Sequence, residues 1–251
     1  MHHKSNWTIY FEDLKNSLKN VGFYSAVFIM TIILMRTVVG FAKMPGTVTV
    51  LDICSLPMTM SGFTIFSATF PSWAYAAQFY REEKNHYDYF IVSRMSWKKY
   101  GIMRIISVSV SGGMILSVPL SIVFSFAYLV GKRELGDAFE GMYVRTVIQN
   151  IGIPLTLCIK TGLGFLFGSF WALFGLFSSF FLKNRFGPYL VPFIFSQFFW
   201  IIFQNFPVFN PNLLVRGEDI DSYLLSGIIL VIYNLIIAFA CFFVFARRGK
   251  Q

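Results

Sequence analysis

The stretch YLLSGIILVIYNLIIAFACFFVFA, residues Tyr223–Ala246, contains no charged side chain. An α-helix needs about 20 consecutive apolar residues to cross a hydrocarbon core that is about 30 Å thick. This stretch is long enough, and in lipid a helix satisfies all of its backbone polar groups internally. The stretch therefore predicts a membrane-spanning helix.

The rest of the 251-residue chain follows the same pattern, since 56% of it is hydrophobic and only 13% is charged, whereas a soluble domain is about 25% charged. We predict an all-α, polytopic membrane protein with six transmembrane helices. The predicted spans are Gly22–Ala42, Pro57–Phe79, Ile105–Val130, Thr161–Leu182, Tyr189–Phe206 and Tyr223–Ala246. No stretch between the spans is long enough for a core of its own, so residues 1–251 form a single transmembrane domain.

Residues 5–20, ahead of the first span, have the pattern of an amphipathic helix. One helical face carries apolar side chains, namely Trp7, Tyr10, Phe11, Leu14 and Leu18, and the opposite face carries Glu12, Asp13, Lys15, Asn16 and Lys19. We predict an interfacial helix along the inner leaflet. A plain membrane anchor and a role in partner contact both remain open.

The distribution of Lys and Arg sets the orientation, because basic residues concentrate on the cytosolic side of a membrane. With both termini in the cytosol, most of the 21 Lys and Arg residues are cytosolic, and the inverted topology would place them outside. We expect a multi-pass protein of the bacterial cytoplasmic membrane. The net charge of +9 then reflects orientation and contact with membrane lipids, not nucleic-acid binding.

The longest polar segment, residues 80–104, lies between the second and third predicted spans on the cytosolic side. Tyr87, Phe90 and Ile91 have the spacing of one apolar face of a short helix, and Ser96 can cap the helix that enters the third span. This pattern favours docking to a soluble partner. A solvated turn with aromatic anchors at the headgroups is the alternative.

The layout resembles the permease subunit of the type-two exporter family of ABC transporters, which has an amphipathic elbow helix, six spans and a cytosolic coupling loop after the second span. In that family the loop has an acidic pair, an apolar run, small residues, a Tyr or Val and a basic residue. This chain supplies Glu82-Glu83, Tyr89-Phe90-Ile91-Val92, Ser93, Ser96, Tyr100 and Arg104, and departs at His86-Tyr87, where Gly-Thr is common, and at Met95, where Pro is common.

The resemblance implies that the loop inserts into a separate ATP-hydrolysing subunit. The implied partners are two copies of an ABC ATPase subunit and a second permease copy or homologue, and the implied cargo is a lipid, peptide or antibiotic-like molecule. The residues expected to contact the ATPase subunit are Glu82, Glu83, Tyr87, Phe90, Ile91 and Arg94.

The chain itself is not expected to be an enzyme, because it lacks the G-x-x-x-x-G-K-[ST] phosphate loop. Glu82-Glu83 resembles the paired glutamates of membrane-embedded proteases, but the only histidines are His2, His3 and His86. We therefore predict no catalytic site, no cofactor and no metal site.

Three ionisable or small-residue features lie within the spans or at their edges. Arg36 is either a cation that lines a cavity for anionic or amphiphilic cargo, or a side chain that extends to the interface or forms a structural pair. Lys160 is expected to reach the outer interface. Gly112, Gly164 and Gly168 permit close helix packing.

A non-transporting scaffold or assembly subunit that recruits a cytosolic partner, and a secondary carrier, are the alternatives to an exporter. The sequence fixes neither the substrate, nor the direction of transport, nor whether the assembly is a homo- or heterodimer. In residues 131–160, Gly152 and Pro154 predict a break, with an interfacial lead-in before the fourth span.

Overall fold

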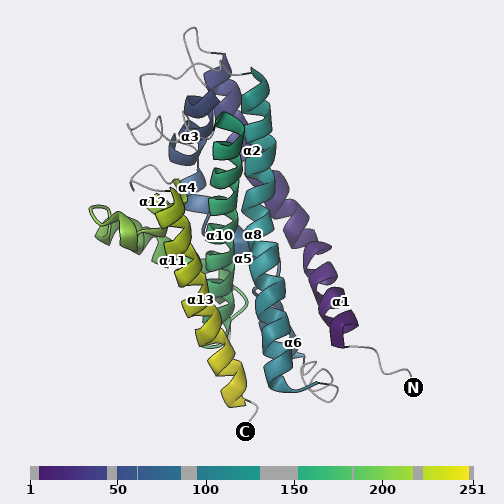
Figure 1. The fold of residues 1–251 in the computed structure, drawn as a ribbon. Helices are drawn as coiled ribbons and strands as arrows, with labels where there is room; N and C mark the ends of the chain where they lie inside the picture. The colour runs from purple at the N-terminus through teal and green to yellow at the C-terminus, as the bar shows by residue number, and fades with distance from the viewer. Residues whose placement is uncertain are drawn as a thin grey trace.

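The computed structural model describes residues 6–43, 50–60, 62–85, 95–130, 152–182, 184–216 and 223–248. Within these ranges, all regular secondary structure is helical. The prediction of an all-α chain is confirmed for this part of the protein (Figure 1).

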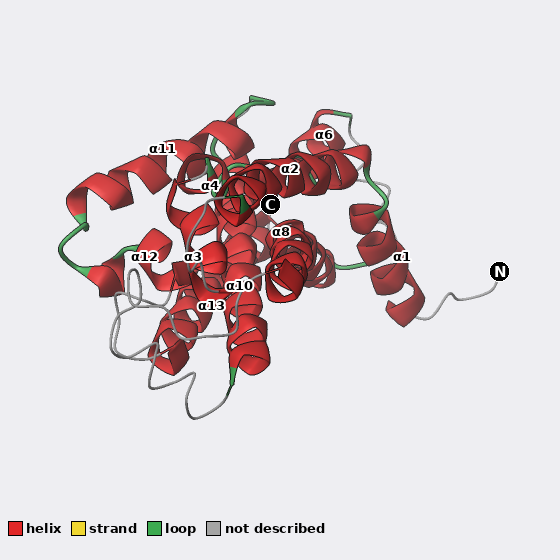
Figure 2. Ribbon diagram, turned by 90° about the horizontal axis from the view of Figure 1, so that it is seen from above, coloured by secondary structure: helices red, strands yellow, loops and turns green. Residues whose placement is uncertain are grey.

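Four helices are long and apolar enough to cross a membrane by their length and composition. They are α2 (Val21–Ala42), α8 (Trp97–Val130), α10 (Ile153–Ser179) and α13 (Tyr223–Arg248). The helices α8 and α10 pack together along the middle of the bundle, α2 packs on α8, and α13 packs on α10 and α8 (Figures 1 and 2). The chain is therefore a multi-pass helical protein by its architecture.

Glycines bring α8 and α10 into close contact, as the small-residue pattern predicted. A Cβ atom at Gly168 would lie 2.5 Å from the carbonyl oxygen of Gly112, so only hydrogen fits there. Ser169 Oγ donates a hydrogen bond to the carbonyl oxygen of Ser109 at 2.8 Å across the same interface. Small residues at helix crossings allow such close packing in membranes.

The second predicted span is not one continuous helix. In place of a helix over Pro57–Phe79, the chain forms four short ones, α3 (Val50–Met60), α4 (Phe63–Phe66), α5 (Phe70–Trp73) and α6 (Gln78–Lys84). Proline removes a backbone donor and glycine is a poor helix former, and Gly62 and Pro71 stand at the starts of α4 and α5. The segment still follows the length of the bundle, from α3 at one end to α6 at the other (Figure 1).

Two other helices begin earlier than predicted. Helix α8 begins at Trp97, eight residues before the predicted span, and the backbone N–H of Lys99 donates to Ser96 Oγ at 3.5 Å, as expected for the cap. Helix α10 begins at Ile153, directly after Gly152 with its φ of 80°. The predicted break therefore lies at the start of α10, where Pro154 is tolerated in the first turn, and no separate lead-in precedes the span within residues 152–182.

The fifth predicted span corresponds to α11 (Gly187–Ile202), which has 16 residues and is shorter than a straight crossing requires. It projects sideways from the bundle in Figure 2. The 3₁₀-helix η1 (Pro207–Phe209) and α12 (Pro211–Arg216) follow it. Four helices are long and apolar enough to cross a membrane. The structure does not show the six spans that the sequence predicted.

The first predicted helix is present as α1 (Asn6–Leu18), and its position along the inner leaflet stays a prediction. It lies beside the first turns of α8, at the end of the bundle that also holds α6 and the last turn of α13 (Figure 1). We call this the α1 end. Its described basic residues include Lys15, Lys19, Arg81, Lys84, Lys98, Lys99 and Arg247.

Candidate functional site

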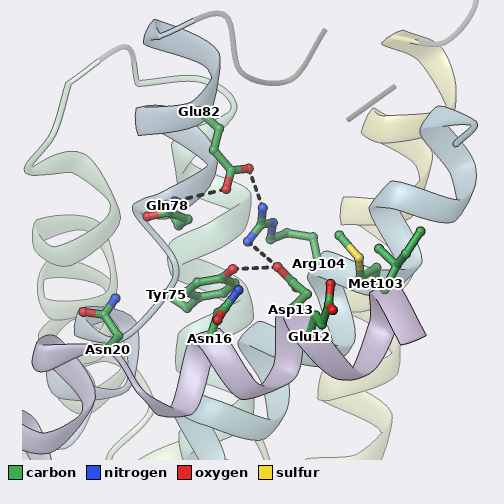
Figure 3. Close-up of a pocket in the computed structure, with 10 residues that line it drawn as sticks. Glu12, Asp13, Asn16, Asn20, Tyr75, Gln78, Glu82, Met103 and Arg104 are labelled. Atoms are coloured by element: carbon green, nitrogen blue, oxygen red, sulfur yellow. Dashed lines mark hydrogen bonds and ion pairs between the residues drawn. The ribbon is translucent and has the colours of Figure 1, made fainter. Parts of the chain in front are cut away.

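A buried ion cluster at the α1 end joins three helices that are distant in sequence (Figure 3). Arg104 of α8 is only 1% exposed, and its guanidinium lies between Asp13 of α1 and Glu82 of α6. Arg104 Nη1 donates to Asp13 Oδ1 at 3.2 Å, and Nη2 donates to Glu82 Oε2. A buried charge is costly unless it is paired. Separating the helices would leave Arg104 unpaired, so these contacts hold the three helices together.

Neighbouring polar side chains complete the cluster. Tyr75 OH donates to Asp13 Oδ1 at 2.6 Å, and Tyr100 OH donates to Glu82 Oε2 at 2.6 Å. Gln78 Nε2 donates to Glu82 Oε1 at 3.0 Å. The six residues that make up this Arg104 cluster are Asp13, Tyr75, Gln78, Glu82, Tyr100 and Arg104.

Two aromatic rings flank the guanidinium. The central guanidinium carbon of Arg104 is 4.6 Å from the ring centroid of Tyr75 and 5.3 Å from that of Tyr100. Both distances are within the range of cation–π attraction. The rings and the two carboxylates compensate together for the loss of water around this charge.

Local structure explains how these side chains meet. Tyr100 and Arg104 are four residues apart on α8 and therefore share one helical face. On α1, Asp13 and Ser17 are also four residues apart, and both are buried. After α1, Asn20 Nδ2 donates to the carbonyl oxygen of Ala74 at 2.6 Å, which fixes the corner between α1 and α2.

An aromatic layer extends the contacts from the cluster to the other helices. Phe79 of α6, Phe180 after α10 and Phe245 of α13 have ring centroids 4.9–5.3 Å apart in each pair. The Tyr100 ring lies 5.6 Å from that of Phe245. The cluster is thus in contact, through these rings, with α10 and α13.

The residues expected to contact an ATPase subunit differ in their positions. Glu82 is buried and paired within the chain, and Glu83 is half-buried. The other four, Tyr87, Phe90, Ile91 and Arg94, lie outside the described residues.

The sequence reasoning missed the inward role of Asp13, which it placed on the polar face of residues 5–20. Asp13 is 9% exposed and faces α8, while Phe11 is 73% exposed. Within the predicted polar face, Asp13 is buried, whereas Glu12, Lys15, Asn16 and Lys19 are exposed. The sequence did contain a signal for this contact. Asp13 on α1 is acidic, and Arg104 at the start of the third predicted span is basic, so the two can form an ion pair.

The two basic residues within the spans also have defined places. Arg36 is exposed on α2 and lines neither of the two cavities described below. Lys160 is fully buried, and its Nζ donates to Ser55 Oγ of α3 at 3.0 Å, so the prediction that it reaches the interface was wrong. The reason is that α10 begins at Ile153, which places Lys160 two turns inside the helix.

Two cavities lie beside the cluster. The larger, of about 550 Å³, is bounded by α1 and by Tyr75, Glu82 and Arg104 (Figure 3). The smaller, of about 230 Å³, shares Asn20 and Gln78 with it. In the part of the chain that the structure describes, no group of three or more His, Cys, Asp or Glu side chains could hold a metal ion.

Comparisons with protein-family models, with curated proteins and with solved structures show no match to this chain. The polar atoms of the Arg104 cluster form ion pairs and hydrogen bonds that link α1, α6 and α8. Such an arrangement can transmit movement between these helices.

Proposed function

We propose that the chain is the transmembrane permease subunit of an ATP-driven ABC exporter in a bacterial cytoplasmic membrane. Two ATPase subunits would dock on the loop between α6 and α8 of two paired permeases. The cargo would be a lipid, peptide or antibiotic-like molecule. The sequence resemblance supports this choice of family, and the geometry of the α1 end supports a coupling role for the loop.

The observation that carries the proposal is the position of the Arg104 cluster at the base of that loop. Glu82 lies near the end of α6, Arg104 lies two turns into α8, and residues 86–94 connect the two helices. Their ion pair closes the base of the loop, and Asp13 adds α1 to it. A displacement of the loop would therefore move α1, α6 and α8 as one unit.

The charge of the α1 end supports a cytosolic location for the loop. Exposed Lys15 and Lys19 on α1, Arg81 and Lys84 on α6, and Lys98 on α8 lie at this end. Basic residues near span ends favour the cytosolic side. An ATPase subunit in the cytosol would then reach the loop directly.

Co-purification tests the proposal. The wild-type chain, purified from its native membrane, should bring down a P-loop ATPase in a fixed ratio, with vanadate-sensitive ATP hydrolysis. Phe90→Asp and Glu83→Arg should each abolish the association and the hydrolysis. The first substitution places a charge in an apolar contact, and the second reverses the charge of a polar contact. Lys15→Glu, a charge reversal on α1 outside the loop, is the control and should leave both intact.

Two results would contradict the proposal. An ATPase that stays bound and active in both loop variants would show that the loop is not the contact. Co-purification of a soluble protein without a P-loop would favour the scaffold alternative.

The buried Lys160 is the observation that favours a secondary carrier as a second candidate. Ionisable residues inside membrane helices often mark ion or substrate pathways, and Lys160 lies fully buried beside Ser55. A carrier would transport in proteoliposomes that contain this chain alone under an ion gradient. An exporter would be inactive there until the ATPase and ATP were added.

A further inference from the structure

Most of the charged side chains that line the larger cavity at the α1 end are acidic. Three carboxylates line it, those of Glu12, Asp13 and Glu82, against the single guanidinium of Arg104 (Figure 3). A concave site lined mainly by one sign of charge concentrates ligands of the opposite sign. The cavity is therefore suited to a cation.

The hydrogen bonds within the cluster leave one acceptor unused. Asp13 Oδ1 accepts from both Arg104 and Tyr75, whereas Asp13 Oδ2 is buried and accepts from no residue that the structure describes. Asp13 is 9% exposed, and it lines the cavity. A buried carboxylate oxygen that accepts no hydrogen bond is unfavourable. A ligand that donates an N–H to Asp13 Oδ2 would remove this cost. The amide side chains of Asn16 and Gln78 lie on the same cavity.

We propose that this cavity binds the primary ammonium of a phosphoethanolamine lipid headgroup. A primary ammonium supplies three N–H donors to carboxylate and amide oxygens, as the Lys ammonium does. A quaternary ammonium has none, and it is usually recognised by aromatic faces. The aromatic ring on this cavity, Tyr75, already faces the Arg104 guanidinium.

The surroundings of the cavity point to a lipid as the source of the amine. The adjoining smaller cavity adds Arg81, a cation suited to the lipid phosphate, and Trp73. Val21, which lines that cavity, is 81% exposed, and an exposed apolar surface continues from it along α2. Its members are Tyr24, Phe28 and Ile32. An ammonium in the larger cavity, a phosphate at Arg81 and acyl chains along α2 would match the order of groups in a phospholipid. This inference does not depend on the ATPase partner.

Native mass spectrometry of the full-length protein tests it. The detergent-solubilised chain is mixed with equal amounts of palmitoyl-oleoyl phosphatidylethanolamine and palmitoyl-oleoyl phosphatidylcholine, which differ only in the methyl groups on the headgroup nitrogen. We expect the wild type to retain phosphatidylethanolamine preferentially. Glu12→Gln and Asn16→Leu should each reduce that preference about threefold, the size expected for one partly exposed polar contact.

The controls separate the site from general effects. Glu83→Gln removes a carboxylate on α6 that does not line the cavity, and it should leave the preference unchanged. Arg81→Gln should weaken retention of both lipids equally, because both carry the phosphate. All four substitutions avoid Asp13 and Arg104, so the ion cluster that supports the fold stays intact.

Three outcomes would overturn the inference. Equal retention of the two lipids by the wild type would exclude an ammonium site. A preference that survives both Glu12→Gln and Asn16→Leu would place the lipid elsewhere. Displacement of the lipid by an equal concentration of soluble glycerophosphoethanolamine would show that the cavity takes the free headgroup compound and not a membrane lipid.

Discussion

Arg104 carries a buried charge that two carboxylates from different helices compensate. We predict that Arg104→Met destabilises the protein by about 3–5 kcal/mol, because it leaves Asp13 and Glu82 buried and uncompensated. The melting temperature of the detergent-solubilised protein, followed by intrinsic fluorescence, measures this loss.

Two further variants serve as comparisons for the stability of Arg104→Met. Lys98→Met removes an exposed positive charge from the same helix and should change stability by less than about 0.5 kcal/mol. Arg104→Lys should remain destabilised, because an ammonium cannot reproduce the forked contact with both carboxylates. If Arg104→Met were as stable as Lys98→Met, the cluster would have no structural role.

Lys160 offers a test of burial at a second residue. The folded protein, treated with an amine-reactive ester and digested for mass spectrometry, should be labelled at the exposed Lys98 and Lys99 and far less at the fully buried Lys160. Unfolding in a denaturing detergent should remove the difference. Equal labelling of Lys160 and Lys98 in the folded protein would contradict its position between α10 and α3.

At the residue scale, the sequence revealed the types of residue but not their partners. Arg104 and Glu82 were assigned to the family's loop pattern, yet they pair with each other and with Asp13. That pairing depends on a contact between α1 and α8, which are about 90 residues apart, and no local pattern encodes it. Residue periodicity placed Asp13 on the solvent side because it assumes that the apolar face is the one that packs.

Close packing of α8 on α10 leads to a prediction at the scale of elements. Gly168→Ala should destabilise the protein by about 1–3 kcal/mol, because its Cβ would lie 2.5 Å from the carbonyl oxygen of Gly112. On the same helix, Gly162 has no atom within 4 Å of a built Cβ. Gly162→Ala should therefore be neutral or stabilising by up to about 1 kcal/mol, as alanine is the better helix former.

Thermal unfolding of the two glycine variants in the same detergent makes this comparison. A Gly168→Ala protein as stable as Gly162→Ala would mean that the two helices are farther apart than the structure shows. The pair is well matched because both sites lie on α10 and receive the same methyl group.

Elements with one long uninterrupted apolar run were predicted well, and interrupted ones were not. The helices α2 and α13 begin within a residue of the predicted spans, because each starts with a long, mainly apolar run and carries no internal proline. Over Pro57–Phe79, composition alone predicted one helix, but Gly62 and Pro71 divide the chain into short pieces. Contacts such as that of Ser72 Oγ with the carbonyl oxygen of Trp171, at 3.1 Å, satisfy polar groups where the segment is broken.

At the scale of the whole molecule, the sequence predicted an all-helical chain, and this is confirmed for the described residues. The first helix is also present, whereas its position along the inner leaflet stays a prediction. It also placed the two chain ends on one side, and α1 and the last turn of α13 do lie at the same end of the bundle (Figure 1). The number of crossings could not be derived, because α11 is apolar but has only 16 residues, and the segment from α3 to α6 is divided into short helices.

The central claim is that the loop after α6 docks on an ATPase subunit, and site-specific photocrosslinking tests it most directly. A photoreactive phenylalanine analogue replaces Phe90 in the loop or, as a control, the 66% exposed Phe28 on α2. After illumination of native membranes, position 90 should give a covalent adduct with a P-loop ATPase, and position 28 should give none. If position 90 yields no such adduct, or both positions yield it equally, the proposed coupling role of the loop is wrong.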